Sequence, residues 1–183
     1  MGREQYAQAD EVLAFWMEAG ADAWFAKNAD FDRRFRERFM DLHFAAARRE
    51  LEHWLDDADA ALALILLLDQ FPRNAFRDTP HMYATDSLAR KYAKLSIARG
   101  HATQLRAPLA LFLCVPFIHS EDLDDQRRGV QLYKQYAPEN LAFAEEHCDI
   151  IACYGRFPHR NVILGRESTR QELDFLRQGG FAG

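Results

Sequence analysis

The sequence predicts an all-α fold built as one domain over residues 1–183. Apolar residues recur at every third or fourth position, most clearly at Phe31, Phe35, Phe39 and Leu42, while Arg and Glu occupy the opposite helix face. No stretch alternates convincingly between apolar and polar residues, as half-buried strands would. About half of the 183 residues are apolar, which is enough for a substantial core.

Composition argues against several classes of protein. The formal net charge is −5 and basic residues are interspersed with acidic ones, which argues against a general nucleic-acid binder. The apolar stretches 60–68 and 109–118 are too short to span a bilayer, and the N-terminus lacks the apolar segment of a signal peptide. Cys114, Cys148 and Cys153 lie in apolar runs and are expected to be buried free thiols. We therefore expect a cytoplasmic protein that binds neither nucleic acid nor membrane.

The first half of the chain is expected to form three main helices. Asp10 is a suitable N-cap for a helix over 11–19, which Gly20 ends. A second, amphipathic helix is expected over about 30–54. The run 60–68 is apolar on all sides, so it is expected in the centre of the domain.

Proline and capping signals set the remaining boundaries. Pro72 disfavours helical geometry at Phe71, so the buried helix is expected to end there. Thr79, with a proline after it, is expected to start a helix over 81–99. The other expected helices are 105–118 with a bend near Pro116, 121–136 capped by Ser120, 138–152, and 169–177 with a capping box begun by Ser168 or Thr169.

The stretch 154–168 contains more polar chemistry than a connecting loop needs. Its Phe-Pro-His-Arg-Asn core is echoed by Phe-Pro-Arg-Asn at 71–74, and each copy follows an apolar run. Polar residues also follow the apolar run that ends at Ile118. If successive helices pack antiparallel, these three helix ends lie at comparable positions. We therefore expect them to face one polar pocket.

Arginines outnumber acids in this expected pocket, so a carboxylate or phosphate is its natural ligand. The expected ligand-binding residues are Asp69, Gln70, Arg73, Asn74, Arg156, Arg160, Asn161 and Arg166. A structural alternative is that these arginines pair with the nearby acids and hold loops in place.

Histidines are the candidates for proton transfer, because imidazole titrates near neutral pH. His119, His147 and His159 qualify, and the expected catalytic set is His119 and His159 with Glu121, or Asp69, as the orienting carboxylate. No metal is expected, since HExxH and Cys/His clusters are absent and arginines would repel a cation. No cofactor is expected, and no GxSxG nucleophile motif is present.

These strings resemble the bacterial DUF924 family, an uncharacterised group in the TPR-like helical superfamily. The resembling stretches are 66–74, 84–86, 116–123 with Gln126, 155–161 and 164–168. The resemblance implies an all-α, TPR-like right-handed array of about eight or nine helices stacked as antiparallel pairs. It implies no established activity.

Three functions remain open at this point. In the first, the chain is a binding module whose pocket receives a small anionic ligand or an acidic peptide. In the second, it is a metal-independent enzyme in which His119 or His159 moves a proton while Arg73 and Arg160 hold an anionic substrate. In the third, it is an interaction scaffold with the polar motifs as internal ion pairs. A homodimer is also open, if aromatic side chains are exposed.

Overall fold

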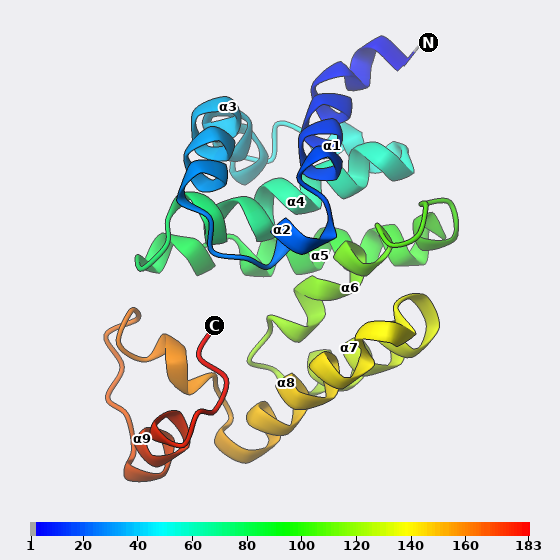
Figure 1. Ribbon diagram of the computed structural model, residues 1–183. Coiled ribbons are helices and arrows are strands. Elements are labelled where there is room, and N and C mark those ends of the chain that lie inside the picture. The colour runs from blue at the N-terminus through cyan, green and yellow to red at the C-terminus, as the bar shows by residue number, and fades with distance from the viewer. Residues whose placement is uncertain (1–2) are drawn as a thin grey trace.

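A computed structural model describes residues 3–183 as an assembly of helices (Figure 1). The α-helices are α1 Ala7–Ala19, α2 Ala21–Trp24, α3 Ala29–Ala47, α4 Ala58–Ala75, α5 Asp86–Ala98, α6 Leu111–Ile118, α7 Leu123–Tyr136, α8 Leu141–Tyr154 and α9 Arg170–Arg177. The 3-10 helices are η1 Arg3–Tyr6, η2 Glu52–Asp56, η3 Pro80–Tyr83, η4 His101–Thr103, η5 Pro138–Asn140 and η6 Pro158–Arg160. Residues 3–183 contain no strand, so the all-α prediction is confirmed. The TPR-like right-handed arrangement remains a prediction.

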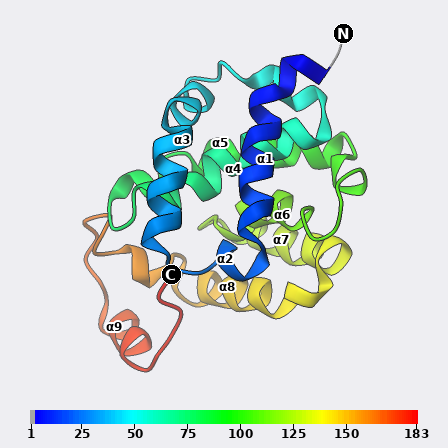
Figure 2. The same cartoon turned by 45° about the horizontal axis from the view of Figure 1, so that its top comes forward.

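Helix α4 lies at the centre, as its apolar sequence predicts. Every side chain from 60 to 72 is buried. Helices α1, α3, α5 and α6 all pack against α4, and α1 and α3 cross it in both overall views (Figures 1 and 2). Asp57 caps its N-terminus by accepting the amide of Ala60 at 3.0 Å. Within residues 3–183, no helix is long and apolar enough to cross a membrane.

The predicted end of this helix near Phe71 is wrong, because α4 continues through Pro72 to Ala75. Pro72 has no N–H to donate to the carbonyl of Leu68, one helical turn earlier. The hydroxyl of Thr85, just before α5, donates to that carbonyl at 2.5 Å. A side chain from another segment therefore replaces the missing donor. The polar residues that follow Leu68 consequently lie on a helix and not in a loop.

Several other predicted helices differ in extent from those in the structure, and the helix expected over 138–152 divides into η5 and α8. The helix expected over 30–54 is α3, which ends earlier because Arg49 adopts a left-handed φ of 67° and the chain turns there. The helix expected over 81–99 divides into η3 and α5. The helix expected over 105–118 is reduced to α6, since turns occupy 107–110.

The predicted caps are partly confirmed. Thr169 caps α9 and forms a reciprocal capping box with Glu172. Asp122, and not Ser120, caps α7, because its carboxylate accepts the amides of Asp124 and Asp125 at 2.9 and 3.0 Å. Asp10 lies inside α1, which begins earlier.

The cysteines differ in exposure. Cys114 is buried and Cys148 is partly buried, whereas Cys153 is exposed near the end of α8. The expectation of a buried thiol is therefore wrong for Cys153, because its helix has one face in solvent.

A small apolar cluster attaches the C-terminal region to α8. Ile150, Ile151 and Phe157 are buried together, and Phe175 and Phe181 pack against them. In Figure 1 the segment after α9 turns back from that helix toward the middle of the molecule. This packing brings η6 and the C-terminal segment beside α8.

We predict that Thr85→Val lowers the free energy of unfolding by about 1–3 kcal/mol, because the buried carbonyl of Leu68 loses its replacement donor. Urea unfolding measures this loss. In a Pro72→Ala background, residue 72 regains an N–H that can donate to the Leu68 carbonyl. Thr85→Val should then lower the free energy of unfolding by less. An equal cost in the two backgrounds would contradict this account of the proline.

Candidate functional site

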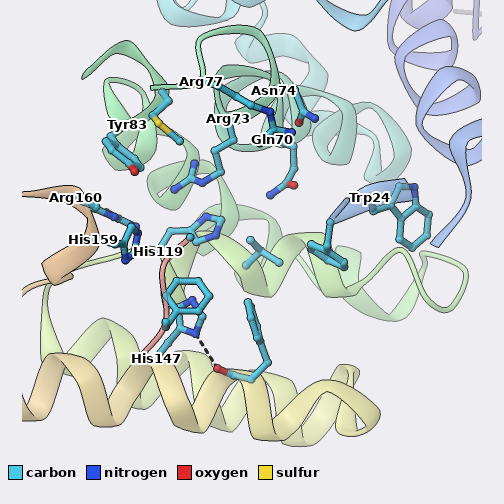
Figure 3. A pocket seen from close by; sticks show the side chains of 16 residues that line it. Trp24, Gln70, Arg73, Asn74, Arg77, Tyr83, His119, His147, His159 and Arg160 are labelled. Carbon is cyan, nitrogen blue, oxygen red and sulfur yellow. Dashed lines mark hydrogen bonds between the residues drawn. The ribbon is translucent and has the colours of Figure 1, made fainter. Parts of the chain in front are cut away.

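A cavity of about 300 Å³ lies where the end of α4, the end of α6, α8, η6 and the C-terminal segment meet. Figure 3 shows Gln70 and Arg73 extending from α4 on one side and His147 from α8 on the other. Arg160 enters from η6, and Trp24 of α2 lies at the far end. Segments distant in the sequence therefore form one site.

Arg73 is held firmly by carboxylates. Its Nη1 and Nη2 donate to the two oxygens of Asp86 at 2.8 and 3.0 Å, and Nη1 also donates to the backbone carbonyl of Asp69 at 2.7 Å. Burial opposes its charge, but Asp86 and Asp69 raise the pKa of Arg73 above its ordinary value. Arg73 is thus a permanent cation with a bidentate partner.

Asn74 and Arg77 continue the same wall and share one carboxylate on α3. Asn74 donates to Asp32 at 2.7 Å, and Arg77 donates to both oxygens of Asp32 at 2.6 and 3.1 Å. These contacts fix the C-terminal end of α4 against α3. The charge of Arg77 is therefore balanced within the protein.

Asp69 and His119 form a hydrogen-bonded pair beside the cavity. The carboxylate of Asp69 is 1 % exposed and accepts Nδ1 of His119 at 2.8 Å and the amide of Gln70 at 2.6 Å. Burial would raise the pKa of Asp69, but the contacts with His119, Arg73 and Gln70 lower it below its ordinary value. Burial and the charge of Arg73 lower the pKa of His119, although Asp69 acts in the opposite direction. At neutral pH the pair is a carboxylate with a neutral imidazole.

Arg160 is buried but incompletely bonded. The residue is 6 % exposed, and its guanidinium lies 4.6 Å from the ring centre of Tyr83 and 4.4 Å from that of Phe157. Its nearest acidic partner is Asp86 at 3.7 Å, and its Nε has no hydrogen-bond partner in the described part of the chain. Burial and the charge of Arg73 lower the pKa of Arg160 to about 10.

Two further histidines line the cavity, and both are neutral. Nδ1 of His147 lies 2.8 Å from the carbonyl of Phe143, and burial lowers the pKa of His147 to about 3. Burial and the charge of Arg160 lower the pKa of His159 to about 3. Among residues 3–183, no three His, Cys, Asp or Glu side chains form a group that could hold a metal ion.

The other predicted site residues hold the 155–168 segment in place. Arg166 makes a bidentate pair with Glu121 at 2.7 and 2.9 Å, and Glu121 also accepts the amide of Phe157. Arg156 pairs with the buried Glu172 at 2.6 and 2.8 Å. Asn161 joins these two pairs, because it donates to Glu172 and accepts from Arg166. The structural alternative describes these residues well, and none of the four predicted ones, Glu121, Arg156, Asn161 and Arg166, lines the cavity.

The structure thus divides the predicted site residues into two groups. Those that line the cavity are Gln70, Arg73, Asn74, His119, His159 and Arg160, with Asp69 bonded behind them. The sequence analysis did not single out Asp86 and Tyr83, which contact Arg73 and Arg160, or Phe181 in the wall. Of these three residues, only Asp86 could have been found from the sequence, because it ends the 84–86 stretch that resembles the DUF924 family. The binding and catalytic roles remain predictions.

Comparisons with known proteins identify the family and give no activity. A family model described as a bacterial protein of unknown function, DUF924, matches residues 12–180, so the chain belongs to this family. A solved structure of a protein of unknown function from Agrobacterium tumefaciens is similar, with 52 % identity and a TM-score of 0.92. The similarity covers 94 % of this chain and 98 % of that one. No curated protein matches.

We predict that acid weakens the fold through the neutral histidines. His147 has a folded pKa of about 3 and an ordinary value of 6.5. Between these values the unfolded chain takes up a proton that the folded chain does not. The stability present above pH 6.5 is therefore lost as the pH falls toward 3.

His147→Phe removes this contribution, so the stability lost between pH 7 and pH 4 should shrink by about 2–3 kcal/mol. Urea unfolding at the two pH values measures it, and His53→Phe, at an exposed position, is the control. An unchanged loss in His147→Phe would contradict the prediction.

Proposed function

We propose that this member of the DUF924 family binds a small organic anion, a carboxylate or a phosphate, in the cavity beside Arg160. The cavity volume of about 300 Å³ suits a small molecule better than a peptide. A cytoplasmic location agrees with free thiols, which persist in reducing compartments.

The observation that carries the proposal is the incomplete bonding of Arg160. A buried guanidinium normally has a bidentate carboxylate and filled donors. Asp86 gives both of its oxygens to Arg73, so Arg160 keeps only a 3.7 Å contact and a bare Nε. None of its Nη groups has a hydrogen bond to the described residues, and an anion in the cavity would supply acceptors for them.

The scaffold alternative does not account for this arginine. Because the pKa of Arg160 is lowered, the folded state disfavours its charge at any pH below about 10, and this costs stability. A residue that served only to stabilise the fold would have a raised pKa, as Arg156 does beside Glu172. Arg160 thus differs from the paired arginines of its own segment.

A second candidate function, acid–base catalysis without a metal, is favoured by the Asp69–His119 pair. A buried carboxylate that holds Nδ1 of a neutral imidazole is the arrangement found in many general bases. The orienting carboxylate would be Asp69, since Glu121 is bonded to Arg166. No carboxylate in residues 3–183 holds Nδ1 of His159, so His119 is the stronger candidate of the two.

We predict opposite effects on stability for two matched substitutions. Arg160→Met removes a poorly paired buried charge and keeps contact with the two aromatic rings, so unfolding free energy should stay the same or rise by about 1–3 kcal/mol. Arg166→Met removes the bidentate arginine partner of the partly buried Glu121, which keeps only the amide of Phe157 among its hydrogen bonds to described residues. This substitution should lower the unfolding free energy by about 1–3 kcal/mol. Urea unfolding of both variants measures this. A large destabilisation by Arg160→Met would favour the scaffold alternative.

We predict that small anions stabilise the protein through Arg160. Thermal unfolding would be measured with acetate, butanoate, 3-phenylpropanoate, inorganic phosphate and a sugar phosphate. An anion at about 100 times its dissociation constant should add roughly 2.7 kcal/mol. The gain should be present in wild type and absent in Arg160→Met.

Arg127→Met, at an exposed position of α7, serves as the charge-matched control and should respond as wild type does. The proposal fails if no anion stabilises wild type, or if Arg160→Met gains as much as the control.

A further inference from the structure

We infer that the ligand is a monocarboxylate that also carries a hydroxyl donor, attached to an aliphatic or aromatic body. This inference deepens the proposed function and rests on it. It comes from the hydrogen-bonding capacity that the cavity residues leave unused, taken one group at a time.

His119 offers an acceptor. Its Nδ1 faces an ionised carboxylate, which can only accept, so Nδ1 carries the proton. Because the ring is neutral, Nε2 holds a lone pair. Residues 3–183 supply no hydrogen-bond donor to this nitrogen, and His119 lines the cavity. A ligand O–H or N–H would complete it.

His147 offers a second acceptor by the same logic. Its Nδ1 donates to the carbonyl of Phe143, which fixes the proton on that nitrogen (Figure 3). The ring is neutral, so its Nε2 is also a lone pair. The described residues again provide no donor to this nitrogen.

Gln70 offers a third acceptor. Its amide nitrogen donates to Asp69 at 2.6 Å, and a carboxylate accepts only, so the amide oxygen is the end left free. Gln70 lines the cavity beside Arg73 (Figure 3). Three residues with an unused neutral acceptor and one incompletely bonded guanidinium therefore line one cavity.

The charge balance favours a single negative charge on the ligand. Arg73, Arg77 and Arg160 are matched by the carboxylates of Asp32, Asp69 and Asp86. A monoanion can take the unfilled donors of Arg160, whereas a phosphate dianion would add two charges to a neutral set. Phosphate also brings acceptor oxygens where the cavity already has acceptors.

The rest of the wall is apolar and aromatic. Trp24, Phe143 and Phe181 line the cavity, and Phe181 lies 5.9 Å from Phe143 between ring centres. These rings would surround a hydrocarbon part of the ligand. The ligand class that fits is therefore a small hydroxy acid with an apolar body.

The test compares acids that differ only in a hydroxyl group. Isothermal titration would measure butanoate against its 2-, 3- and 4-hydroxy derivatives, and 3-phenylpropanoate against its 2-hydroxy, 3-hydroxy and 4-hydroxyphenyl derivatives. At least one hydroxylated acid should bind at least about tenfold more tightly than its parent, because unfilled acceptors gain a donor. Inorganic phosphate should bind more weakly than that acid.

Single variants then test whether the acceptors cause this preference. His147→Phe, Gln70→Leu and His119→Asn each alter one acceptor, and His147→Phe leaves no carboxylate without a donor. At least one of them should reduce the preference for the hydroxylated acid about tenfold while the parent acid still binds. Arg127→Met should leave the preference unchanged.

The outcomes separate this inference from the proposed function. If parents and hydroxylated acids bind equally, or if no variant alters the preference, the inference is overturned and anion binding stands. If phosphate binds best, the monocarboxylate class is overturned. If none of these anions binds wild type, the proposed function fails and the inference fails with it.

Discussion

A carboxylate buried in the central helix sets the requirements that the rest of the site meets. Asp69 is 1 % exposed, and an ionised group at that depth needs several donors. Gln70 and His119 supply two of them, and the guanidinium of Arg73 lies 3.6 Å away. Arg73 is bonded in turn to Asp86, the first residue of α5. The charge of Asp69 thus ties α4 to α5 and to the end of α6.

Because Asp86 is bonded to Arg73, Arg160 is left without a carboxylate of its own. Asp86 is used by Arg73, so Arg160 must share a carboxylate that is already bidentate. Arg156 and Arg166, in the same segment, each have a carboxylate of their own. Replacing a poorly paired buried ion by an apolar group tends to be neutral or stabilising, so the fold alone gives no reason for Arg160. Departures of this kind from the rules of stability are expected at functional sites.

The sequence was sufficient to predict the helical class and the meeting of three polar helix ends, because helical periodicity and polar groups at helix ends are local signals. It did not indicate which carboxylate each arginine would meet. Glu121 and Arg166 were therefore placed in the pocket, although they pair with each other. The helix end predicted at Pro72 was wrong for the same reason. Thr85, whose hydroxyl replaces the missing N–H donor to the Leu68 carbonyl, is distant from Pro72 in the sequence. Pairing depends on tertiary distance, which spacing in sequence does not contain.

Whether the cavity side chains donate or accept hydrogen bonds depends on the surrounding charges more than on the residue types. A histidine can donate or accept, and a site dominated by carboxylates would keep it protonated. Here burial acts with the charge of Arg73 on His119 and with the charge of Arg160 on His159 to lower the pKa of each ring, and burial is the main cause for His147. The guanidiniums therefore have two effects: they attract an anion, and they keep the neighbouring imidazoles as acceptors. A preference for ligands that carry a hydrogen-bond donor follows from this protonation state. A protonated imidazole could only donate, and it would bind a carboxylate oxygen of the ligand instead.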